Sequence, residues 1–141
     1  GIGERRNLER IREASKDYNL VIAGQTIPWL SIGELQLLYA SASVLLYCSI
    51  YEGFGLPIVD CFACGVPVVT SDVSSMPEIA GDGAIYANPR NVSDMKEKLK
   101  MVMEDEGLRK DLIKKGFKQV KKFSWKKAAR ETAEVYRRLT Q

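Results

Sequence analysis

The sequence Ser49-Ile-Tyr-Glu-Gly-Phe-Gly-Leu-Pro-Ile-Val-Asp60 lies where a predicted strand meets a predicted helix. The apolar run from Val44 to Cys48 precedes it and indicates a buried strand, and Pro57 suits the first turn of a helix. In open parallel sheets, the carboxyl ends of the strands hold the ligand crevice. Glycines there let the backbone approach a ligand, and the free N–H groups of the helix favour an anion. The stretch is therefore a candidate binding site for an anionic ligand.

The alternation of helix and strand continues on both sides of this stretch. Apolar runs predict strands at 20–24, 44–48, 67–70 and 84–87. Helical spacing and capping residues predict helices near 8–14, 31–42, 57–64, 93–103, 108–120 and 125–139. Such alternation is typical of an α/β fold, here a Rossmann-like parallel sheet flanked by helices.

The length of the chain fits a single domain over residues 1–141. Only a few residues separate the predicted strand at 20–24 from the apolar run at 27–30, whereas a crossover between parallel strands needs a dozen or more. Either residues 25–31 are a loop or a strand-crossover unit is absent. The sequence leaves open whether the domain is incomplete at its N-terminus and around residues 24–31.

The composition excludes several classes of site. The chain has no histidine, which removes His-based acid–base catalysis, Ser-His and Cys-His nucleophiles and most zinc sites. Cys61 and Cys64 have a metal-like spacing, but they lie within a predicted helix without a second pair, so we expect them in the core and expect no metal. The longest apolar run is too short to span a bilayer. We therefore expect a cytoplasmic protein.

Lys and Arg concentrate after Lys96, in the predicted C-terminal helices, although the formal net charge is only +3. Solvated helix faces usually have this composition. The same face could contact anionic lipid, so a peripheral membrane contact stays open, and we expect no nucleic acid. Trp125 begins the last of these helices and is predicted to be a packing anchor.

Glu52 and Asp60 are the candidate ligand-binding carboxylates, and both are expected to face one crevice. Carboxylates accept hydrogen bonds from hydroxyls, so two of them beside an anion site suggest a sugar at one end and a ribose at the other. Alternatively, the glycines serve only the turn, Glu52 is a solvated loop charge and Asp60 offsets the helix dipole. Phe54, Leu56 and Pro57 crowd apolar groups around Glu52, which favours the binding site over an exposed loop. The expected ligand is a nucleotide sugar.

These residues resemble the signature of the GT-B-fold, family-four retaining glycosyltransferases. The matching segments are Glu52-Gly-Phe-Gly-Leu-Pro57 with Asp60, Gly65-Val-Pro-Val-Val-Thr70, Leu20-Val-Ile-Ala-Gly24, Pro77-Glu78 and Phe123-Ser-Trp125. The resemblance implies the C-terminal half of a GT-B fold. It also implies transfer of a hexosyl group from a nucleoside diphosphate sugar to a hydroxyl acceptor, with retention and without a metal or other cofactor. The acceptor would be a glycan, a lipid-linked glycan or a small molecule, and its site would come from an N-terminal acceptor domain.

By this resemblance, Glu52 and Arg6 are the expected catalytic residues. Glu52 would hold hydroxyls of the donor sugar, and Arg6 stands where the family usually has a diphosphate-binding Lys. Asp60 would bind the ribose, although the family usually has Glu there. The remaining donor contacts would come from the backbone amides of Gly53, Phe54, Gly55 and Leu56.

Two other interpretations stay open. The chain could be a non-catalytic nucleotide-sugar-binding module, which Asp60 and the missing first strand favour. It could also be an interaction domain that uses its basic C-terminal helices.

Overall fold

Three short strands form a parallel sheet in the computed structural model, which describes residues 6–140. The strands are β1 (Leu45–Tyr47), β2 (Val68–Ser71) and β3 (Ala84–Ala87), in the spatial order β1-β2-β3. Leu46 pairs with Val69, and Val69 pairs in turn with Ile85. The predicted parallel α/β architecture and three of the four predicted strands are thus confirmed.

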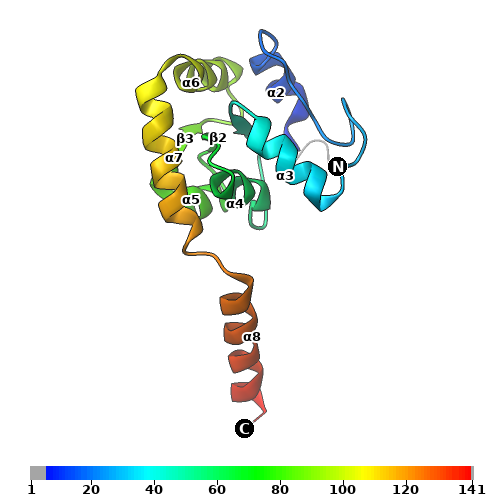
Figure 1. The fold of residues 1–141 in the computed structure, drawn as a ribbon, viewed down its shortest axis with the longest axis vertical. Coiled ribbons are helices and arrows are strands. Elements are labelled where there is room, and N and C mark those ends of the chain that lie inside the picture. The colour runs from blue at the N-terminus through cyan, green and yellow to red at the C-terminus, as the bar shows by residue number, and fades with distance from the viewer. Residues whose placement is uncertain (1–5, 141) are drawn as a thin grey trace.

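Helices cover both faces of this sheet (Figure 1). They are α2 (Leu8–Ala14), α3 (Ile32–Ser41), α4 (Leu56–Ala63), α5 (Met76–Ala80), the short 3-10 helix η1 (Gly81–Gly83), α6 (Val92–Glu104), α7 (Glu106–Val120) and α8 (Trp125–Leu139). Ser31 and Glu34 form the predicted capping box at the start of α3. Side chains at Asn91, Asp105 and Ser124 accept hydrogen bonds from the first turns of α6, α7 and α8, which explains where these helices begin.

The alternation of side chains along β2 divides the core in two. Val68 points into a cluster with Ile58 and Phe62 of α4, whereas Val69 points into a cluster with Met95 of α6. All four residues of β2 are buried, as expected for the central strand of a parallel sheet that is covered on both faces. α7 closes one side, where Gly116 leaves room for Phe62: a Cβ atom there would lie 2.7 Å from the ring.

The predicted strand at 20–24 is wrong. Ala23 forms only an isolated bridge with Ile27, across a tight turn in which Gly24 has a φ of 76°. A strand needs a neighbour for its backbone N–H and C=O groups, and none of the described segments lies beside Leu20 and Val21 to provide one.

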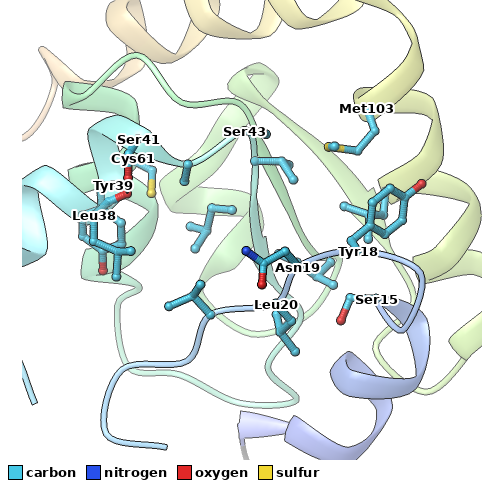
Figure 2. Close-up of a pocket in the computed structure, with 16 residues that line it drawn as sticks. Ser15, Tyr18, Asn19, Leu20, Leu38, Tyr39, Ser41, Ser43, Cys61 and Met103 are labelled. Carbon is cyan, nitrogen blue, oxygen red and sulfur yellow. Dashed lines mark hydrogen bonds between the residues drawn. The ribbon is translucent and has the colours of Figure 1, made fainter. Parts of the chain in front are cut away.

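A hollow of about 440 Å³ lies between this segment and the edge strand β1. Figure 2 shows Asn19 and Leu20 at its centre, with Leu38 and Tyr39 of α3 on one side and Met103 of α6 on the other. Ser43, just before β1, also lines it, so the hollow lies toward the amino end of the strand. This is the opposite end from the loop that carries Glu52.

Helix α8 extends away from the rest of the domain (Figure 1). None of its residues is buried, and Trp125 is 80% exposed. The prediction that Trp125 is a packing anchor is therefore wrong, because Trp125 only lines an open hollow between α4 and α8 and its ring is not covered by the described residues. The apolar face of α8 includes Trp125, Tyr136 and Leu139, and all three side chains are exposed.

Candidate functional site

Glu52 lies in the turn that joins β1 to α4, at the carboxyl edge of the sheet. The side chain is half-buried, and its Oε1 accepts a hydrogen bond of 2.9 Å from Ser49 Oγ. Ser49 is itself buried, and its carbonyl oxygen accepts a bond of 2.6 Å from Ser71 Oγ at the end of β2. The carboxylate is thus tied, through Ser49 and Ser71, to the ends of β1 and β2.

A second pair of serines holds the backbone of the same turn. Ser74 Oγ accepts from Glu52 N at 3.2 Å and donates to Glu52 O at 2.8 Å. Ser75 Oγ lies 3.0 Å from Glu52 O and 2.7 Å from Phe54 O. Ser74 adopts a left-handed backbone with φ of 60°, which is uncommon for a residue other than glycine. We call Ser74 and Ser75 the serine clamp.

The turn leads directly into the N-terminus of α4. Gly55 is the N-cap, has a φ of 116°, and provides no side-chain cap, so the first N–H groups of the helix have no capping side chain. At Gly53 an added Cβ would meet nothing within 4 Å, which leaves the backbone open to a ligand. Free N–H groups and the positive end of the helix dipole make this turn suitable for an anion, as the sequence predicted.

The charges of Arg6 and Glu52 both affect the pKa of the Tyr47 phenol, in the last residue of β1. Burial raises the pKa of Tyr47, and the adjacent Glu52 carboxylate raises it further, whereas the positive charge of Arg6 lowers it. Arg6 is exposed. Asn7, the next residue after Arg6, donates a hydrogen bond to the carbonyl of Cys48 just after β1, so the backbone of Arg6 lies near the carboxyl end of this strand, where Glu52 also lies.

Asp60 lies in α4, about one turn after its start, as predicted. It lines a second hollow of about 420 Å³ between α4 and the start of α8, together with Phe54 and Leu56. Partial burial raises the pKa of Asp60. Glu52 is not among the described residues that line this hollow. That both carboxylates serve one ligand stays a prediction.

The predicted crowding of apolar groups around Glu52 is also corrected. The Phe54 ring packs edge-on against Phe123, with 5.6 Å between centroids, and Leu56 lines the same hollow. Because the left-handed Gly55 redirects the chain after Phe54, these side chains lie toward α8 rather than over the carboxylate. The hydrogen bonds that hold Glu52 come instead from Ser49 to its carboxylate and from the serine clamp to its backbone.

The structure places the two cysteines of the predicted metal-like spacing in and near the core. Cys61 is fully buried, which confirms its predicted place in the core, and Cys64 is half-buried. Among residues 6–140, no three Cys, Asp or Glu side chains lie together as they would for a metal ion. None of the helices in that range is long and apolar enough to cross a bilayer.

Residues 2–119 match the sequence profile of the family described as glycosyl transferases group 1. This match covers most of the chain and includes the turn with Glu52. The chain belongs to the glycosyl transferases group 1 family. Its fold is the C-terminal, Rossmann-like part of a GT-B glycosyltransferase, as the resemblance implied.

Individual relatives agree with this assignment. The chain is 40% identical over 106 residues to the O-antigen chain mannosyltransferase B of Escherichia coli, which is 75% of this chain and 28% of that protein. It is 30% identical over 139 residues to the serotype-specific mannosyltransferase WbdA of Escherichia coli, covering 95% of this chain and 17% of that protein.

Solved structures give the same result. The sucrose-phosphate synthase of Thermosynechococcus elongatus superposes with a TM-score of 0.70 and 26% identity, over 94% of this chain and 34% of that one. The chain thus spans between 17% and 34% of the lengths of these three proteins.

The sequence analysis missed the residues that hold Glu52. Ser49 and Ser71 are ordinary loop and strand-end residues in the sequence, and the serine clamp lies more than 20 positions away from its partners. Only the pairing of β1 with β2 brings these segments together. One signal was available: Ser71, Ser74 and Ser75 follow a predicted strand, at the edge where parallel strands present their ligand-binding loops.

Proposed function

We propose that this chain is the donor-binding domain of a retaining hexosyltransferase that uses a nucleoside diphosphate sugar and a hydroxyl acceptor. The observation that carries the proposal is the Glu52 carboxylate, held by Ser49 in a glycine-rich turn directly before the free N-terminus of α4. A carboxylate suits sugar hydroxyls, and a helix N-terminus suits a phosphate. Two relatives are mannosyltransferases by name, so mannose is the first sugar to test.

In this proposal Glu52 binds hydroxyls of the donor sugar and sets its orientation. Arg6, held near the end of β1 by the hydrogen bond of its neighbour Asn7 to Cys48 O, pairs with the diphosphate and stabilises the charge that it gains as it leaves. The backbone of Gly53, Phe54, Gly55 and Leu56 offers N–H groups to the phosphates. Positive charge from Arg6 and α4 takes the place of a metal, and no cofactor is needed.

Asp60 has a less direct role in the proposal. It lines the hollow beside α8 together with Phe54 and Leu56 of the turn, so a ribose bound there would lie next to the turn. We keep Asp60 as the ribose-binding residue. The cytoplasmic location stays a prediction.

We also propose that an N-terminal acceptor domain completes the active site. The chain spans about a third or less of its relatives, and α8 exposes an apolar face of Trp125, Tyr136 and Leu139. A face of this kind needs a covering surface.

A titration of the 141-residue chain with UDP, GDP and ADP, each with and without its sugar, tests the proposal. We expect one base to bind, with affinity lowered by Glu52→Gln for the sugar conjugate and by Arg6→Ala for the bare diphosphate. Arg12→Ala is the matched control, since Arg12 is exposed at the far end of α2 and bonds to Gln25. The absence of binding by every nucleotide, in a folded protein, would contradict the donor site.

The exposed α8 favours a second candidate, an interaction domain. Lys126, Arg130 and Arg137 lie on the helix opposite its apolar face. Salt-sensitive binding to anionic vesicles, without nucleotide binding, would favour this function and a peripheral membrane contact. A complete enzyme that binds donor but never turns over would instead identify a non-catalytic module.

A further inference from the structure

Asn7 is a buried polar residue with an unusual backbone. Its side chain is only 4% exposed, and its φ and ψ of 58° and 31° lie in the left-handed region. Asn tolerates this region better than other residues with a side chain, because its short amide can hydrogen-bond locally. The residue stands between Arg6 and Leu8, the first residue of α2.

The carboxamide of Asn7 joins three segments that are distant in sequence. Its Nδ2 donates to Cys48 O at 2.9 Å, at the end of β1, and to Pro89 O at 2.5 Å, just beyond β3. Its Oδ1 accepts a bond of 3.0 Å from Arg10 Nη1, one turn further along α2. Both amide hydrogens and one lone pair are thus used, so the side chain has a single satisfied orientation.

These bonds fix Arg6 relative to Glu52. Cys48 directly precedes Ser49, the residue that donates to the Glu52 carboxylate. The Asn7–Cys48 hydrogen bond therefore joins the residue that follows Arg6 to the residue that precedes Ser49. α2 packs on α6, and its buried Ile11 and Ala14 share a core cluster with Cys48 and Ala87, so the Asn7 bonds act at the first turn of a helix whose later turns are held by apolar contacts.

We propose that Asn7 is a positioning residue, which holds Arg6 at the carboxyl edge of the sheet so that its guanidinium can engage the diphosphate of the donor. This inference rests on the proposed function. Without the carboxamide, the start of α2 loses its hydrogen bonds to the segments after β1 and β3, and the adjacent Arg6 loses the contact that holds its backbone at this edge. The change should weaken the binding of the diphosphate rather than of the sugar, because Glu52 keeps its hydrogen bonds to Ser49 and to the serine clamp.

The test compares Asn7→Gly with Arg6→Ala, the double variant and the parent chain. Glycine accepts the left-handed backbone and removes the side chain with its carboxamide. The probes are GDP, UDP and ADP with the matching nucleosides, titrated by calorimetry, and thermal melting checks that each variant is folded. Asn19→Gly, a change of an exposed loop Asn, is the matched control.

We expect Asn7→Gly to weaken diphosphate binding about tenfold and to leave nucleoside binding within about twofold of the parent, since a charge-assisted contact is lost and the base contacts are kept. The double variant should bind no more weakly than Arg6→Ala, because residues that act through one contact are not additive. If Asn7→Gly does not fold, Asn7→Ser, which keeps a hydroxyl donor, replaces it in the same comparison.

Two results would overturn the inference. One is a folded Asn7→Gly protein that binds diphosphate like the parent while Arg6→Ala does not, which leaves the proposed function intact. The other is an equal loss of nucleoside and diphosphate binding, which would make Asn7 a purely structural residue. If Arg6→Ala itself changes nothing, the assignment of Arg6 fails and the proposed role of Asn7 fails with it.

Discussion

The serine clamp predicts that Ser75→Ala loosens the turn around Glu52 without unfolding the domain. The Ser75 hydroxyl lies within bonding distance of two carbonyl oxygens, at 3.0 Å from Glu52 O and 2.7 Å from Phe54 O. A hydroxyl has one hydrogen, so the two acceptors share it. Alanine removes this bond and leaves the bonds of Ser74 in place.

The expected loss is about 1 kcal/mol in the free energy of opening the turn, since one neutral hydrogen bond contributes about 0.5–1.5 kcal/mol. The freed carbonyl of Phe54 belongs to an exposed residue, so water can replace the hydroxyl and the loss should not be larger. If the whole domain loses the same amount, its melting temperature should fall by about 3–5 °C.

Hydrogen exchange of the amides at 52–58 measures the effect directly. We expect exchange there to become about fivefold faster, which corresponds to about 1 kcal/mol, and exchange in the core strands to keep its rate. Ser41→Ala is the control, because Ser41 Oγ donates a similar bond of 2.9 Å to Leu38 O within α3, far from the turn. If the turn amides exchange at the parent rate in Ser75→Ala, this hydroxyl does not hold the turn and the argument from its distances is refuted.

Three further predictions concern the fold. Gly116→Ala should lower the free energy of unfolding, measured in urea, by up to about 2 kcal/mol. Overpacking against Phe62 costs about 1–3 kcal/mol, and the higher helix propensity of alanine offsets about 1 kcal/mol of this. Gly107→Ala, at the exposed start of the same helix, is the control and should not destabilise the domain. Burial raises the pKa of Cys48 to about 12, whereas the thiol in the unfolded chain titrates at about 8.5. Above about pH 8.5 the unfolded chain therefore loses this proton and the folded protein keeps it, so the free energy of unfolding should fall as the pH rises. The fall should be less steep in Cys48→Ala than in the parent chain. Hydrogen bonds within the capping box lower the pKa of Glu34, so its contribution is present above about pH 4.3 and lost below; Glu34→Ala should flatten the acid side of a thermal melting profile.

Local signals in the sequence were sufficient for most of the fold. The capping box at Ser31, Pro57 at the start of α4 and the short apolar runs gave elements close to those observed, because capping and side-chain periodicity act over only a few residues. The predicted strand at 20–24 failed for the complementary reason. Its apolar composition suited a strand, but a strand forms only where another backbone accepts its hydrogen bonds.

The sequence by itself determined the family, the parallel α/β fold and the turn that carries Glu52, since these follow from contiguous residues. Only the tertiary structure decided what surrounds that turn: the serine clamp from the loop after β2, the Asn7 carboxamide between β1 and β3, and the hollow beside α8 that Asp60 lines. Each of these depends on which distant segments the parallel pairing of the strands brings together. A hydrogen bond across 82 positions leaves no periodic pattern in the sequence, because its partners become neighbours only when the sheet has formed.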